Sequence, residues 1–158
     1  MSLHFQQRRR VLGWPVAAAL GASLPRGARA HAFVEEGFTV IHPWCEVAPA
    51  GSTDLVVLLR IVEINRADRL LGAETPVASQ MLLQVPPRRP FDPPDASAAG
   101  AAAGLPLQPG HDIILTHFGP HLLIDRVLAD LHFGREYPLT LHFEQAGKVE
   151  AALIIGLD

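Results

Sequence analysis

The feature that most constrains the fold of this chain is a succession of short apolar runs, rich in β-branched residues, that end at turns containing glycine or proline. Runs this short predict strands rather than helices, because an amphipathic helix needs a longer periodic stretch. The expected strands are 33–34, 38–42, 55–64, 69–73, 80–85, 113–116, 121–124, 137–144 and 149–155. Pro43 is expected to end the second strand, since proline cannot donate to a central ladder. This spacing predicts one all-β domain built as a sandwich.

One long segment breaks this pattern. Residues 86–104 have five prolines among the first nine residues, followed by an Ala/Gly/Ser-rich stretch. Proline has no amide donor, so no ladder can run through the segment. We expect a Pro/Ala-rich arm inside the domain, and a loop of this length is usually either functional or without fixed structure.

The first thirty residues have the pattern of a cleavable export signal. A basic stretch at 8–10 precedes the apolar run 11–24, and Ala28-Arg29-Ala30 matches a signal-peptidase site. The paired arginines Arg8 and Arg9 favour a twin-arginine-like signal, with an ordinary secretory signal as the alternative. Cleavage after Ala30 gives a domain of residues 31–158, and cleavage after Ala32 also fits the pattern. We therefore expect a periplasmic protein that has no membrane span once the signal is removed.

The charge of the predicted domain excludes one class of partner. Removing residues 1–30 takes away five of the 13 Lys and Arg and no acidic residue, which leaves 8 basic against 16 acidic residues. A domain this acidic is a poor binder of nucleic acid, whose phosphates need a basic face. Its field favours cations or a basic partner surface. The sequence also has no nucleophile elbow or phosphate-binding glycine loop, so we expect a protein that is not an enzyme.

Cys45 is the single cysteine, so the chain cannot form an intrachain disulfide. We expect it to be a buried hydrophobic residue beside Trp44. The alternative is a free thiol that serves as a soft copper ligand.

Four blocks of sequence resemble the periplasmic copper chaperones called PCu(A)C. They are His31-Ala32 followed by Pro43-Trp44, the segment 67–78 (ADRLLGAETPVA), the turn 105–110 (LPLQPG) and the hairpin 137–150 (YPLTLHFEQAGKVE). The resemblance implies a cupredoxin-like Greek-key β-sandwich that carries Cu(I) between His and Met ligands. It also implies delivery of copper to cuproenzymes such as cytochrome c oxidase, through the proteins that assemble its copper centre.

The chain keeps only part of the family's ligand pattern. His121 stands in the loop where the family has its His-x-Met motif, and Leu123 replaces the methionine. Gln84 stands where the other histidine of the family begins its motif, and the arm occupies the region of the second methionine. Met81 is the only methionine of residues 31–158, and its strand alternation predicts a core position. Cu(I) favours thioether sulfur, so these replacements change the chemistry of the site.

Other histidines offer replacement ligands. His117 and His121 flank one turn, and His111 lies on the turn that leads into the same hairpin. After cleavage at Ala30, His31 would add a free α-amine to its imidazole. Nitrogen ligands suit Cu(II) or Zn(II) better than Cu(I). The predicted metal ligands are therefore His121, His117, His31 and His111, whereas we expect surface or structural roles for the remaining histidines, His42, His132 and His142.

The leading hypothesis is a copper-binding, copper-chaperone-like protein with an altered site centred on His121. The alternative is a metal-free homologue that kept the sandwich and acts as a protein-binding accessory module. A weaker third hypothesis is an oxidative copper enzyme that uses the His31 terminus.

Overall fold

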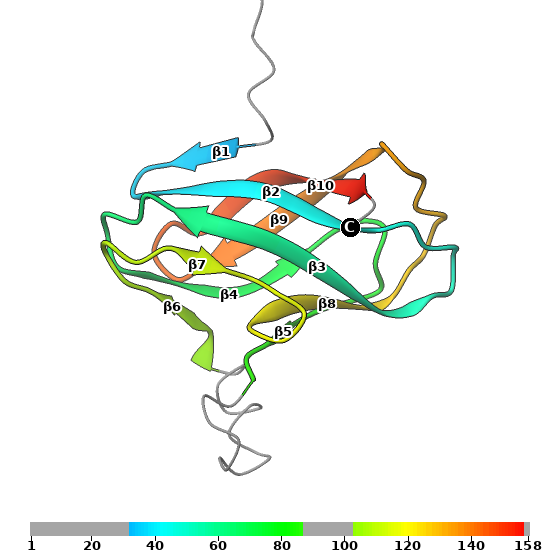
Figure 1. Ribbon diagram of the computed structural model, residues 1–158, viewed down its shortest axis with the longest axis horizontal. Coiled ribbons are helices and arrows are strands. Elements are labelled where there is room, and N and C mark those ends of the chain that lie inside the picture. Colours follow the sequence, from blue (N-terminus) through cyan, green and yellow to red (C-terminus); the bar gives the residue numbers. More distant parts are fainter. Residues whose placement is uncertain (1–31, 87–102, 157–158) are drawn as a thin grey trace, which may run out of the picture.

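The computed structural model describes residues 32–86 and 103–156. The predicted export signal, His31 and nearly all of the predicted arm lie outside these described residues. The regular secondary structure of the described residues is almost entirely strand (Figure 1), which confirms the all-β prediction. Among the described residues there is no helix that is long and apolar enough to cross a membrane.

Ten strands form one curled sheet. They are β1 (Ala32–Glu35), β2 (Phe38–Glu46), β3 (Thr53–Val62), β4 (Asp68–Glu74), β5 (Met81–Gln84), β6 (Leu105–Leu107), β7 (Ile113–Ile114), β8 (His121–Arg126), β9 (Glu136–Phe143) and β10 (Lys148–Gly156). Their order is β5-β8-β3-β2-β10-β9-β4-β6, with β1 added to β2 and β7 added to β3. Among the described pairs only β2 and β10 run parallel. The two ends of the sheet meet where β4 contacts β5, so the sheet wraps around one core (Figure 1).

The core is the inner surface of this curl. Alternate residues of each strand face inward, as the period of two requires. In β3 the inward residues are Val57, Leu59 and Ile61, and in β8 they are Leu122 and Ile124; all five are at most 2% exposed. Side chains at the intervening positions, such as Leu123 and His121, face the outer surface and are half-buried. The predicted ligand His121 therefore belongs to the outer face of the sheet.

Two local predictions are corrected. β2 does not end at Pro43: it continues to Glu46 through a register shift between Ile41 and Trp44, where His42 adopts φ of 51°. Pro43 lies within this bulge and is not paired with β3, so its missing N–H is not needed there. Residues 105–107 form the edge strand β6 rather than only a turn.

Candidate metal site

His121 is the first residue of β8, at the edge of the molecule where β5 and β8 pair. Gln84 lies directly opposite it across the β5–β8 ladder. On the other side, Val57 pairs with Leu122, and this register places Leu58 opposite His121. Both sequence positions that the resemblance assigned to histidine ligands are therefore cross-strand neighbours on one outer face.

A tightly bonded loop sets the orientation of the His121 ring. The amide of Thr116 donates to the carbonyl of Pro120 at 2.9 Å, and the amide of Gly119 donates to the Thr116 hydroxyl, also at 2.9 Å. The Nδ1 atom of His121 lies 2.9 Å from the carbonyl oxygen of Gly119. Because a carbonyl only accepts, Nδ1 carries the proton in this contact and Nε2 keeps its lone pair. Metal-binding histidines are typically held this way, with the second ring nitrogen donating to a backbone carbonyl.

His117 lies in the same loop and is exposed. It borders a small cavity on the outer face together with Trp44, Val56 and Leu58. Leu58 therefore touches this cavity and also lies in the cross-strand row of His121. The structure thus places both histidines of the His-Phe-Gly-Pro-His turn near Leu58 of β3, and their binding of one ion stays a prediction.

The remaining predicted ligands do not join this pair in the described structure. His111 follows Gly110, whose amide donates to the carbonyl of Ile64 near the far end of β3. Ile64 lies six positions after Leu58, just past the end of β3, which corresponds to roughly 20 Å of extended chain. His111 is therefore separated from His121, contrary to the expectation that its turn brings it close. His31 lies outside the described residues.

Soft sulfur ligands are also missing from this site. Met81 is 8% exposed and faces the core, as predicted. Cys45 is 1% exposed, and burial, with a smaller contribution from Glu46, raises the pKa of its thiol to about 12. A thiol held protonated is a poor ligand and nucleophile, so the prediction of a buried hydrophobic cysteine is confirmed. Within residues 32–86 and 103–156, no three His, Cys, Asp or Glu side chains gather in a way that could hold a metal ion.

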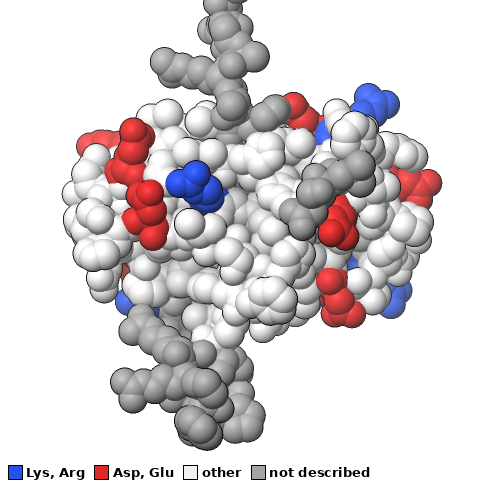
Figure 2. Space-filling view, in the orientation of Figure 1, with Lys and Arg blue, Asp and Glu red and all other residues white. Residues whose placement is uncertain are grey.

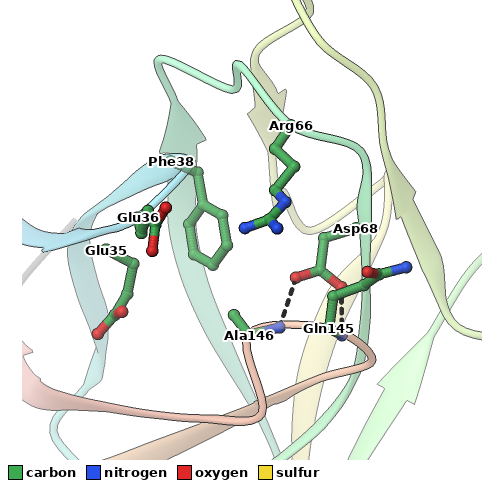
Figure 3. A pocket seen from close by; sticks show the side chains of 7 residues that line it. All are labelled: Glu35, Glu36, Phe38, Arg66, Asp68, Gln145 and Ala146. Atoms are coloured by element: carbon green, nitrogen blue, oxygen red, sulfur yellow. Dashed lines mark hydrogen bonds between the residues drawn. The ribbon is translucent and has the colours of Figure 1, made fainter.

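Another of the four blocks that carry the family resemblance has a structural explanation. The segment 67–78 contains Asp68, whose carboxylate accepts hydrogen bonds from the amides of Arg69 (2.7 Å), Gln145 (2.9 Å) and Ala146 (2.9 Å). Figure 3 shows this carboxylate reaching the tip of the β9–β10 hairpin, at the wall of a cavity of about 280 Å³. Asp68 thereby ties the start of β4 to the hairpin, and its charge is used by the fold.

Sequence reasoning missed three residues of the outer face, namely Trp44, Glu46 and Asp54, which line the cavity beside His117. Their positions depend on the bulge in β2 and on the positive φ of Asp54, 59°. Strand alternation alone does not signal either irregularity.

Several solved structures share this fold. The copper-bound PCuAC domain from PmoF2 superposes with a TM-score of 0.63 at 20% identity, and covers 81% of this chain and 99% of its own. The apo PCuAC domain from PmoF1 gives a TM-score of 0.65 at 20% identity, with 81% and 100% coverage. The solution structure of Cu(I)-DR1885 from Deinococcus radiodurans gives 0.56 at 17% identity, with 83% coverage of both chains. Comparison with curated proteins gives no match.

A family model also matches the chain. The model described as "Putative lipoprotein LpqE-like" covers residues 38–155, which span β2 to β10. The only cysteine of the sequence, Cys45, is buried in β2 and is therefore not a lipid attachment site in this fold. The PCuAC-type fold and the match over most of the described strands confirm the resemblance to PCu(A)C domains, and the chain belongs to the LpqE-like family.

Proposed function

We propose that this protein binds copper at a site centred on His121 and acts as a copper-chaperone-like carrier rather than as an enzyme. The observation that supports the proposal most is the hydrogen bond that fixes the His121 ring with Nε2 free, in a fold shared with a copper-bound PCuAC domain. Export to the periplasm and delivery of copper to the assembly proteins of cytochrome oxidase belong to the same proposal. They are supported by the basic and apolar pattern of residues 1–30 and by the family match.

The ligand set favours a carrier. His121 is joined by His117 of the same loop, and Gln84 and Leu123 occupy positions where a histidine and a methionine would add ligands. A site with two imidazoles leaves coordination positions for a ligand from outside. A donor or acceptor protein that supplies this ligand would exchange the ion without a high barrier. Imidazole-dominated ligation suits Cu(II) better than the Cu(I) that the family resemblance implies, so both oxidation states belong to the proposal.

Copper titration of single-histidine variants tests the proposal. The full chain carrying Trp14→Phe keeps Trp44 as its only tryptophan, so quenching of its fluorescence reports metal near the outer face. Cu(I) under reducing conditions and Cu(II) in air are titrated against a competing chelator. We expect His121→Ala to weaken binding at least tenfold, and His117→Ala to weaken it less.

Two matched controls complete this experiment. His132→Ala removes an exposed imidazole from another loop, and His111→Ala removes the one separated from the site. Both should leave the affinity unchanged. Equal affinity of His121→Ala and the unchanged protein would exclude the site.

The absence of a third ligand among the described residues favours a second candidate, a metal-free protein-binding module. Copper content of the protein isolated from cells grown with copper separates the two. A stoichiometry near one copper per chain that depends on His121 supports the carrier, and zero copper supports the module.

A further inference from the structure

A cavity beside His117 has a chemistry that copper binding does not use. Its volume is about 190 Å³, and it lies on the outer face where β2 and β3 pair through Trp44 and Leu58. It is lined by Trp44, Glu46, Asp54, Leu55, Val56, Leu58 and His117. Clefts for drug-sized ligands are usually larger, at roughly 300–1,000 Å³. The cavity therefore suits one side chain or one small charged group.

The charges of this cavity have one sign. Glu46 and Asp54 are its carboxylates, and no Lys or Arg is among its lining residues. The Lys and Arg ion pairs of the described residues involve Arg69 with Glu144 and Lys148 with Glu74, which belong to other strands. Glu46 and Asp54 are thus negative groups at a concave surface whose lining contains no Lys or Arg.

The uncharged walls match a long basic side chain. Trp44 is half-buried and offers an aromatic surface, on which a guanidinium binds through cation–π attraction and stacking. Val56 and Leu58 offer apolar surface for an aliphatic stem, as occurs where Arg and Lys bury their methylenes. Two carboxylates favour the planar fork of arginine over the point charge of lysine, because the fork pairs with two acceptors at once.

We propose that this cavity, defined by Trp44, Glu46 and Asp54, is a binding pocket for the guanidinium of an arginine that a protein partner presents to the outer face of β2 and β3. The proposal goes beyond copper binding and does not require a metal. Trp44 pairs with Ile154 of β10, and a Cβ added at Gly156 would lie 3.8 Å from its Cε3 atom, so the indole lies beside the backbone of β10.

The surroundings of the pocket favour a protein as the source of the arginine. Val56 pairs with Leu123 of β8, and Leu123 pairs in turn with Leu82 of β5; both leucines are half-buried and apolar. Figure 2 shows that the face carrying β3 is a broad uncharged area with acidic side chains on either side and few basic ones. Such a face complements a partner surface with an apolar centre and basic residues around it.

A titration with small arginine analogues tests the pocket directly. The probe is N-acetyl-arginine amide, added to metal-free full chain carrying Trp14→Phe, and the readouts are the fluorescence and the indole N–H resonance of Trp44. N-acetyl-citrulline amide has the same shape without the charge, and N-acetyl-lysine amide has the charge without the fork. We expect saturable shifts with the arginine probe, weaker ones with the lysine probe and none with citrulline.

Charge-neutral variants give the matched comparison. Glu46→Gln with Asp54→Asn should weaken arginine binding at least tenfold, and asparagine tolerates the positive φ at position 54. Asp112→Asn with Glu36→Gln removes two carboxylates from elsewhere on the surface and should change nothing. Retention of the other backbone resonances shows that each variant is folded.

The outcomes are distinct from those of copper binding. His121→Ala should lose copper and keep arginine binding, whereas the Glu46/Asp54 variant should lose arginine binding and keep copper. Equal responses to arginine and citrulline would overturn the proposal, and so would unchanged arginine binding in the Glu46/Asp54 variant. A basic peptide bearing one arginine among apolar residues should bind more tightly than the free amide. Binding that is no tighter would mean that the pocket takes a small guanidinium compound and would overturn the assignment to a protein partner.

Discussion

Gln84 lies directly opposite His121 across the β5–β8 ladder, with both side chains on the outer face of the sheet. Cross-strand neighbours have their Cβ atoms roughly 4.5–5.5 Å apart, which lets two imidazoles at these positions reach one ion. Leu123 follows on the same face, two residues along β8. The backbone for a fuller ligand set is present, and the side chains at two of its positions are not ligands for copper.

Restoring these side chains should increase Cu(I) affinity. Gln84→His with Leu123→Met adds an imidazole and a thioether around His121, which are the ligands that Cu(I) prefers. We expect the dissociation constant to fall at least tenfold, or about 1.4 kcal/mol, with a smaller change for Cu(II). Competition with a Cu(I) chelator measures it. The same double substitution in a chain that also carries His121→Ala is the control, and an equal gain there would argue against a site centred on His121.

The loop that orients His121 should matter more for copper than for stability. Thr116→Val removes the hydroxyl that accepts from the Gly119 amide, while Gly119 keeps a longer contact of 3.2 Å to the Thr116 carbonyl. We expect a loss of less than about 1 kcal/mol in the free energy of unfolding. Copper affinity should fall by up to roughly tenfold, because the Gly119 carbonyl that orients His121 is then held less firmly. Thr140→Val removes a surface hydroxyl bonded to Glu150 and should spare copper binding.

Asp68 should be important for stability and not for copper. Asp68→Ala leaves the amides of Arg69, Gln145 and Ala146 without their acceptor. We expect the free energy of unfolding to drop by about 2–3 kcal/mol, measured by urea denaturation, with copper affinity unchanged in the folded protein. Asp68→Asn keeps one carbonyl acceptor and should fall in between. The exposed Asp112→Ala serves as the control, and a similar loss there would refute the role of the hydrogen bonds.

The Cys45 thiol should make the protein less stable at high pH. Its pKa is about 12 in the folded state against 9.0 for a free thiol, because burial disfavours the thiolate. Below pH 9 the thiol is protonated in both states. Between pH 9 and 12 only the unfolded chain loses this proton, so the stability falls as pH rises, by up to about 1.4 kcal/mol per unit.

Comparison with Cys45→Ala isolates this effect. The difference in unfolding free energy between the two proteins should stay constant from pH 6 to 8.5 and shift in favour of the variant above pH 9. Parallel curves up to pH 11 would show that Cys45 does not contribute. Thiol-reactive reagents at pH 8 should label the native protein slowly and the unfolded protein quickly.

The strands that the sequence predicts best are those with clear alternation or a long β-branched run. β3, β9 and β10 follow their expected ranges within two residues at each end. β6 was not predicted because three residues containing a proline give no periodic signal. It forms through long-range contacts, where Pro106 pairs with Arg69 on β4 and the Arg69 guanidinium donates to the carbonyl of Ala103 at 2.6 Å. An edge position tolerates that proline.

The nearness of His117 and His121 was predictable because it depends on neighbours in sequence. His117 and His121 share one turn, and the structure keeps them around Leu58. His111 appeared close because only ten residues separate it from His121, but β7 runs along β3 between them and carries it away. Distances across a sheet follow strand register, which the sequence specifies only through long-range packing.

The bulge between Ile41 and Trp44 exchanges the two sides of β2. Before it, the even-numbered Phe38 and Val40 fill the core, and after it the odd-numbered Cys45 does. Deleting one residue from this bulge would send the Trp44 indole inward and leave a thiol on the surface. One extra backbone unit therefore determines whether this protein presents to the outside an aromatic ring for recognition or a sulfur atom open to oxidation.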